Sequence, residues 1–200
     1  MKNNWNNFKD SIIKQKGLFS IGFADIVGSG ISAFFWLYIA SQLNPDAYGE
    51  IIYFISIAGL VQLVSLIGSS NALTVYTAKN VKIQSTLFFV SILATAVSLA
   101  VITIFLDRID VGLLAVGYVI FSLVNSVMLG KKLFVKYSKL ILSQKILTAI
   151  LGVGLYFVFD VYGIIYGLAL SYIPHLIIFV REFSRTKIDF TLLKPRKGFI

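Results

Sequence analysis

Apolar residues in this sequence come in six long runs, and short polar segments separate the runs. The runs cover residues 17–43, 51–74, 87–106, 111–129, 140–159 and 164–180. A transmembrane helix needs about 17 to 25 apolar residues at a rise of about 1.5 Å per residue, and each run has at least that lower number. The apolar positions are continuous and do not alternate with polar ones, which favours helices over the strands of a barrel. We therefore predict an all-α membrane protein with six transmembrane helices.

The polar segments between successive runs predict three helical hairpins. The first turn, 44–49, contains Pro45 and Gly49, which interrupt helices, and its acidic residues are placed to cap the helix that follows. The segments 107–110 and 160–163 are too short to do more than reverse the chain at one face of the membrane.

The hairpins occupy residues 17–180, between a leader at 1–16 and a basic tail at 181–200. The leader has apolar residues at helical spacing, namely Trp5, Phe8, Ile12 and Ile13. This pattern predicts an amphipathic helix in the membrane interface, with an unstructured leader as the alternative. The apolar run that follows is about twice as long as the core of a signal peptide and ends in no small-residue cleavage site, so we expect a retained anchor.

The composition agrees with a membrane protein. Hydrophobic residues make up 58% of the chain and charged residues 14%, and the mean hydropathy is +0.86. Soluble domains are roughly 45–50% apolar and about 25% charged. The chain contains no cysteine, which excludes disulfides, thiolate catalysis and metal sites built on cysteine.

All but one of the 18 Lys and Arg residues lie before the first run, in alternate connections or in the tail. The exception is Arg108, which shares the intervening turns with acidic residues, namely Asp46, Glu50, Asp107, Asp110 and Asp160. Lys-rich connections face the cytoplasm, so we predict a cell-membrane protein with both termini cytoplasmic. Topology and attraction to anionic lipid account for the net charge of +9, and we expect no nucleic-acid partner. We assign Lys145 to one of these Lys-rich connections.

Asp25 is the only carboxylate within a predicted span, about eight residues into the first run. A charge at the bilayer centre costs about 2.5–3.5 kcal/mol on insertion scales, so this residue should face protein or water. It is a candidate for a substrate or ion pathway. The alternative is a structural carboxylate that reaches the interface or pairs with a lysine.

Four further polar residues in the spans are pathway candidates: Gln62, Asn71, Asn125 and His175. The three amides have a simpler role as hydrogen-bonding contacts between helices. His175 follows Pro174, which removes one helical hydrogen bond and predicts a kink. A lone histidine with no second ligand at helical spacing is no metal site, and proton relay is the alternative function.

Catalytic motifs are absent from the sequence. It has no Ser-His-Asp set, no paired carboxylates in the spans, no phosphate loop and no H-E-x-x-H. We therefore predict neither an enzyme nor a cofactor.

The first hairpin resembles the opening of Wzx-type polysaccharide-biosynthesis flippases, which belong to the multidrug/oligosaccharidyl-lipid/polysaccharide exporter superfamily. In that family the first span ends in an alanine- and leucine-containing run followed by a Leu-x-Pro-(Glu/Asp)-x-(Tyr/Phe)-Gly turn. The matching residues are Leu43, Asn44, Pro45, Asp46, Tyr48 and Gly49. The fifth and sixth runs resemble those of the same proteins in a Tyr-Gly-x-x-x-Gly step, here Tyr162, Gly163 and Gly167.

This resemblance implies one six-helix lobe of a two-lobe transporter, with 181–200 similar to the linker that precedes the second lobe. It implies a lipid-linked oligosaccharide as substrate and a second lobe supplied by a homodimer or a separate chain. Two other interpretations stay open. One is a non-transporting fragment or assembly partner of a glycan-export complex, and the other is a small-molecule exporter lobe of the same superfamily.

Overall fold

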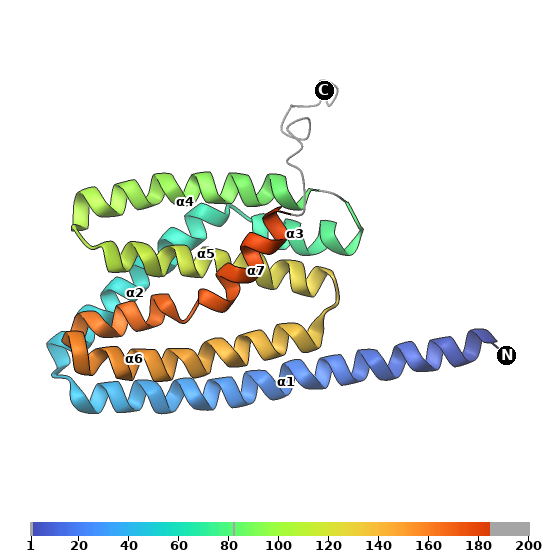
Figure 1. Ribbon diagram of the computed structural model, residues 1–200, viewed down its shortest axis with the longest axis horizontal. Helices are drawn as coiled ribbons and strands as arrows, with labels where there is room; N and C mark the ends of the chain where they lie inside the picture. Colours follow the sequence, from blue (N-terminus) through green and yellow to red (C-terminus); the bar gives the residue numbers. More distant parts are fainter. Residues whose placement is uncertain (1, 82, 185–200) are drawn as a thin grey trace, which may run out of the picture.

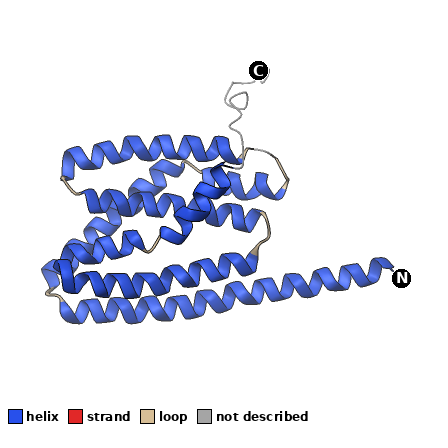
Figure 2. Ribbon diagram, in the orientation of Figure 1, coloured by secondary structure: helices blue, strands red, loops and turns tan. Residues whose placement is uncertain are grey.

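The computed structural model describes residues 2–81 and 83–184, with side chains from Lys16 onward except Leu18. In this part of the chain every regular element is a helix (Figure 2), which confirms the predicted all-α class. The helices are α1 (Lys2–Gln42), α2 (Pro45–Leu66), α3 (Ser69–Ala78), α4 (Gln84–Leu106), α5 (Ile109–Gly130), α6 (Phe134–Leu170) and α7 (Ile173–Ser184).

Five helical stretches are long and apolar enough to cross a membrane. They are Phe19–Gln42, Pro45–Leu66, Gln84–Leu106, Ile109–Gly130 and Phe134–Ser184. The first three bury only 22% of their most apolar window inside the molecule, and large apolar side chains cover the outer surface. A surface of this kind suits lipid, so the helices indicate a membrane-embedded protein.

Helix α5 lies at the centre of the bundle, because 72% of its apolar window is buried and it packs against α2, α3, α4, α6 and α7. Its first half, including Leu114, belongs to one apolar core with α1, α2 and α6. Its second half, including Leu123 and Val124, belongs to another with Phe88 and Phe179. The remaining helices surround this central element (Figure 1).

Helix α6 contains a reversal of the chain within its range. Asp160 has φ 57° and ψ −140°, a backbone conformation unlike that of a helix, and the chain doubles back there (Figure 1). The two arms then touch closely. A Cβ at Gly163 would lie 1.9 Å from the carbonyl oxygen of Leu155, and a Cβ at Gly167 would lie 2.6 Å from the Cα of Gly152. The predicted turn at 160–163 therefore exists, although only Asp160 leaves the helical conformation.

Helix α1 packs along the first arm of α6, and small residues on each helix face large ones on the other. A Cβ at Gly17 would lie 2.6 Å from Phe134, and one at Gly152 would lie 2.7 Å from the ring of Phe35. The two contacts have the same offset in sequence, so the two helices run parallel. The leader is part of this helix, since α1 is unbroken from Lys2. Its predicted amphipathic face and the tail at 185–200 lie outside what the structure describes.

Three helix boundaries correct the sequence-based prediction. The second run is not one helix, because α2 ends at Leu66 and α3 begins at Ser69, with Ile67 and Gly68 at positive φ between them. The cap of α2 is Asn44, whose side-chain oxygen accepts a 2.8 Å hydrogen bond from Ala47 N–H, and not an acidic residue. The sixth run is also broken, because α6 ends and α7 begins around Ser171 and Tyr172, next to the proline where a kink was predicted.

Figure 1 shows that the turns after α1 and α4 and the reversal at Asp160 lie at one end of the bundle. The connections 79–81 and 131–133, and the N-terminal end of α1, lie at the other. We call these the acidic end and the lysine-rich end.

Candidate functional site

A chain of hydrogen bonds joins the two arms of α6 in the interior of the bundle. The Gln144 amide donates to the Thr148 hydroxyl (2.9 Å) and to the Ser171 hydroxyl (3.2 Å). Thr148 and Ser171 lie 3.0 Å apart, and Ser171 donates onward to the carbonyl of Leu168 (2.6 Å). All three polar side chains are buried. We call Gln144, Thr148 and Ser171 the polar triad.

His175 lies one turn beyond this triad, on α7, and is completely buried. Its ring packs against Phe121, at 4.9 Å between ring centres, and near Tyr172, at 6.1 Å. Neither Nδ1 nor Nε2 has a hydrogen-bond partner in the described part of the chain. A buried polar group without a partner is disfavoured, so this position calls for a physical explanation.

Two more candidate residues lie against the central helix α5 or belong to it. The Gln62 amide joins α2 to α5 by donating to the Ser122 hydroxyl (2.5 Å) and the Tyr118 carbonyl (3.3 Å). Asn125, on α5 itself, is buried, and its side-chain oxygen has no partner among the described residues. The hydroxyl of Ser91 on α4 is also buried and has no partner among the described residues. Gln62 therefore has the interhelical contact expected of a polar residue in a span.

The remaining two candidates, Asp25 and Asn71, are exposed on the surface of α1 and α3. They do not share a site with His175 or with the polar triad. Lys145 also lies elsewhere than expected. It is on α6, half-buried, and its stem lies against Gly28 of α1, so it belongs to a spanning helix and not to a connection. Its aliphatic stem covers apolar surface while leaving the ammonium free to point elsewhere.

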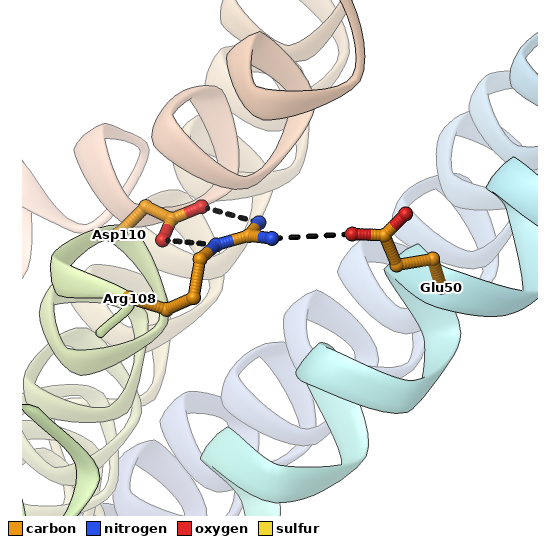
Figure 3. A network of polar contacts seen from close by, with 3 residues as sticks. All are labelled: Glu50, Arg108 and Asp110. Atoms are coloured by element: carbon orange, nitrogen blue, oxygen red, sulfur yellow. Dashed lines mark hydrogen bonds and ion pairs between the residues drawn. The ribbon is translucent and has the colours of Figure 1, made fainter. Parts of the chain in front are cut away.

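Arg108 is the centre of an ion-pair network at the acidic end (Figure 3). Its Nε and Nη2 donate to both carboxylate oxygens of Asp110, at 3.0 and 2.9 Å, and Nη1 donates to Glu50 at 3.2 Å. The guanidinium also lies between two rings, 4.0 Å from the centre of Phe54 and 4.4 Å from that of Tyr162. The hydrogen bonds to Asp110 raise the pKa of Arg108 above its usual value. The network ties together α2, the start of α5 and the return arm of α6.

The lysine-rich end has its own ion pair, between Lys131 and Glu182, and the Gln84 amide donates to the same carboxylate at 3.3 Å. These contacts link α4, the end of α5 and α7. Ion pairs therefore link helices at both ends of the bundle.

Two crevices beside α5 are apolar. One, of about 220 Å³, lies against α4 and Phe179, and the other, of about 170 Å³, lies against Tyr166 and Leu176. They share the wall formed by Val116 and Ile120. Such crevices accept hydrocarbon and offer nothing that would hold a sugar. A more polar hollow of about 360 Å³ lies at the acidic end, beside Asp160.

The sequence analysis missed the polar triad and the function of Arg108 as a link between helices. The spacing of Gln144 and Thr148, four residues apart in an apolar run, was a usable signal, because it places both side chains on one helix face. Ser171 comes from another segment and no local pattern points to it. In the described residues no group of three His, Cys, Asp or Glu side chains is placed to hold a metal ion.

No protein-family model matches the chain, and searches of curated proteins and of solved structures returned no match.

Proposed function

We propose that this chain is one lobe of a membrane transporter that flips or exports a lipid-linked oligosaccharide for cell-surface polysaccharide. The observation that carries the proposal is the row of buried polar groups inside spanning helices, from the polar triad to His175. Polar and ionisable side chains are expensive in a membrane and typically mark the path of a substrate or ion. The sequence resemblance to Wzx-type flippases supplies the substrate class.

The lobe has six spans if the two arms of α6 are counted separately. The reversal at Asp160 lies at the same end as the other short turns (Figure 1), and each arm, with α7 added to the second, exceeds the roughly 20 residues that a span requires. The distribution of lysine supports a cell-membrane location with the lysine-rich end, and thus both termini, in the cytoplasm.

A partner completes the transporter in this proposal, either a second copy or a separately encoded lobe. Asp25 and Asn71 support it, because both are exposed on helices of the lone chain, where lipid would leave them without polar contacts. The same exposure supports the second candidate function, a non-transporting assembly partner of a glycan-export complex.

Reconstitution of the purified chain into liposomes tests the transport function. A fluorescent lipid-linked oligosaccharide is placed in both leaflets, and an impermeant quencher reports the fraction that reaches the outer leaflet. We expect flipping that depends on the protein and slows in Asp25→Asn, with Asp107→Asn in an exposed turn as the matched control. Uptake of a soluble drug-like cation without lipid flipping would instead favour the small-molecule exporter, and the absence of both activities would refute the homodimer version of the proposal.

The absence of cysteine makes the partnership testable by single-cysteine crosslinking. Ser29 is exposed on α1, one turn beyond Asp25, and Ser56 is exposed on α2. Under the homodimer version, Ser29→Cys crosslinks to a dimer in the membrane and Ser56→Cys does not. Liposomes that flip the lipid while both variants stay monomeric would contradict the need for a second lobe.

A further inference from the structure

His175 differs from a structural histidine in the pairing of its two ring nitrogens. It is completely buried, and both of its ring nitrogens are without partners in the described chain. Its aromatic neighbours are Phe121 on α5 and Tyr172 in the break before α7. A structural histidine in a core donates from one nitrogen and accepts at the other. This ring does neither, so the observed position satisfies it poorly and a second position in contact with water would satisfy it better.

The helix is interrupted immediately before this residue. Helix α6 ends at Leu170 and α7 begins at Ile173, and Pro174 has no N–H to continue the hydrogen-bond ladder across the gap. The Tyr172 ring lies against Gly117 of α5, where a Cβ would be 2.7 Å away. Figure 1 shows α6 and α7 as separate helices on either side of this break, and a break of this kind allows α7 to turn relative to α6. The absence of a side chain at Gly117 lets the Tyr172 ring lie directly against α5 in the observed position.

The groups around the His175 ring suit a proton as its ligand. The titratable groups near the ring are the phenols of Tyr172 and, beyond it, Tyr118, while the facing residue of α5 is apolar and the polar triad of α6 is uncharged. The residue lies nine positions from the end of α7 at Ser184, or about 14 Å at 1.5 Å per residue, which is near the middle of a span. Histidine is the side chain that gains and loses a proton near neutral pH.

We propose that His175 is the proton-binding residue of this lobe and that α7 turns about the break at Ser171 and Tyr172 to bring the ring into contact with water. This inference rests on the proposed transport function, since it assigns the coupling ion. In the hydrated position an imidazole nitrogen takes a proton from water and the ring becomes imidazolium. Return of the proton to water on the other side regenerates the neutral ring, and the buried position in the structure belongs to that neutral form.

His175 is the only histidine of the chain, so a histidine-labelled sample has one imidazole signal. Solid-state nitrogen NMR of the full chain in liposomes, at about pH 5 and about pH 8, follows its protonation directly. We expect a neutral ring at the higher pH and a growing imidazolium fraction at the lower, with the ring N–H exchanging into deuterated water. Pro174→Ala, which restores a backbone donor at the break, should slow this exchange several-fold. A ring that stays neutral and unexchanged at both pH values would overturn the proposal.

Lipid flipping in the same liposomes separates this inference from the function on which it rests. We expect a pH gradient to accelerate flipping by the unmodified protein and to leave the rate of flipping by His175→Gln unchanged. Protonation of the ring without any flipping would leave the proton site standing and refute the substrate. Flipping with a permanently neutral ring would refute the proton site alone.

Discussion

Replacement of Arg108 by Met should destabilise the protein strongly. Met keeps much of the aliphatic stem and removes the guanidinium. The carboxylate of Asp110 then loses both of its hydrogen bonds while only 3% of its side chain is exposed. The lost hydrogen bond destabilises Glu50 less, because half of its side chain is already in contact with solvent.

The expected loss of stability comes mainly from Asp110, the buried carboxylate of the network. Removing one partner of a buried ion pair costs about 3–5 kcal/mol, because the other charge is left uncompensated. The rings of Phe54 and Tyr162 also lose their cation, but this contribution overlaps with the first and is not added to it. At about 2–4 °C per kcal/mol for a chain of this size, the melting temperature should fall by about 6 to 20 °C.

Circular dichroism of the detergent-solubilised protein measures this shift, since the chain has no cysteine for thiol-reactive dyes. Asp107→Asn is the matched control. Asp107 is exposed in the same turn at φ 49°, a conformation that Asn also tolerates, so the effect should stay within about 0.5 kcal/mol. Arg108→Lys keeps the charge without the two parallel hydrogen bonds, so its melting temperature should lie between those of Arg108→Met and Asp107→Asn.

A double variant tests the reason for the loss. Arg108→Met combined with Asp110→Asn removes the uncompensated charge and should recover most of the stability lost in Arg108→Met alone. If Arg108→Met melts within error of Asp107→Asn, the network does not stabilise the bundle and the reasoning fails.

Three further predictions concern other parts of the bundle. Gly163→Ala should reduce the yield of folded protein, because the new methyl would meet a backbone carbonyl of the other arm at 1.9 Å. Gly154→Ala, with nothing within 4 Å of the new methyl, should be neutral, and size-exclusion profiles after heating compare the two variants. Gln144→Leu should lower stability by only about 0.6 to 1.7 kcal/mol, because the two hydroxyls of the polar triad stay paired with each other, and a loss above about 3 kcal/mol in a melting experiment would contradict this. Single cysteines at Asp107 and Lys131 should be labelled by an impermeant maleimide from opposite faces of sealed vesicles, and labelling of both from one face would refute the topology.

Much of the helical framework follows from the sequence because lipid imposes one rule everywhere. Backbone groups in hydrocarbon must pair within their own segment, so a long apolar run is a helix and a polar break is a turn. The breaks that the sequence did not reveal are those without polar residues. Ile67 and Gly68 interrupt an apolar run at positive φ, and α3, which begins after them, packs against α5.

The polar interior could be predicted only in part, for a related reason. Sequence analysis recognised polar residues that are rare in spans, such as His175, and passed over Thr148 and Ser171, which often bond to their own helix and so carry little information. Their importance comes from Gln144, which donates to Thr148 on its own arm and to Ser171 beyond the reversal of α6. A contact between two arms is not a local property of either.

Arg108 is the one cation that the described residues place at the acidic end, and it matters for both topology and packing. In the proposed topology Arg108 lies on the translocated side, against the distribution of lysine, so it is an exception that needs a counterpart. The structure supplies two carboxylates and two aromatic rings for it, which makes this arginine part of the fold. Arg108→Met should therefore lower stability without changing orientation. An inverted topology in that variant, measured by the same cysteine labelling, would show that the residue acts during insertion and not in the folded bundle.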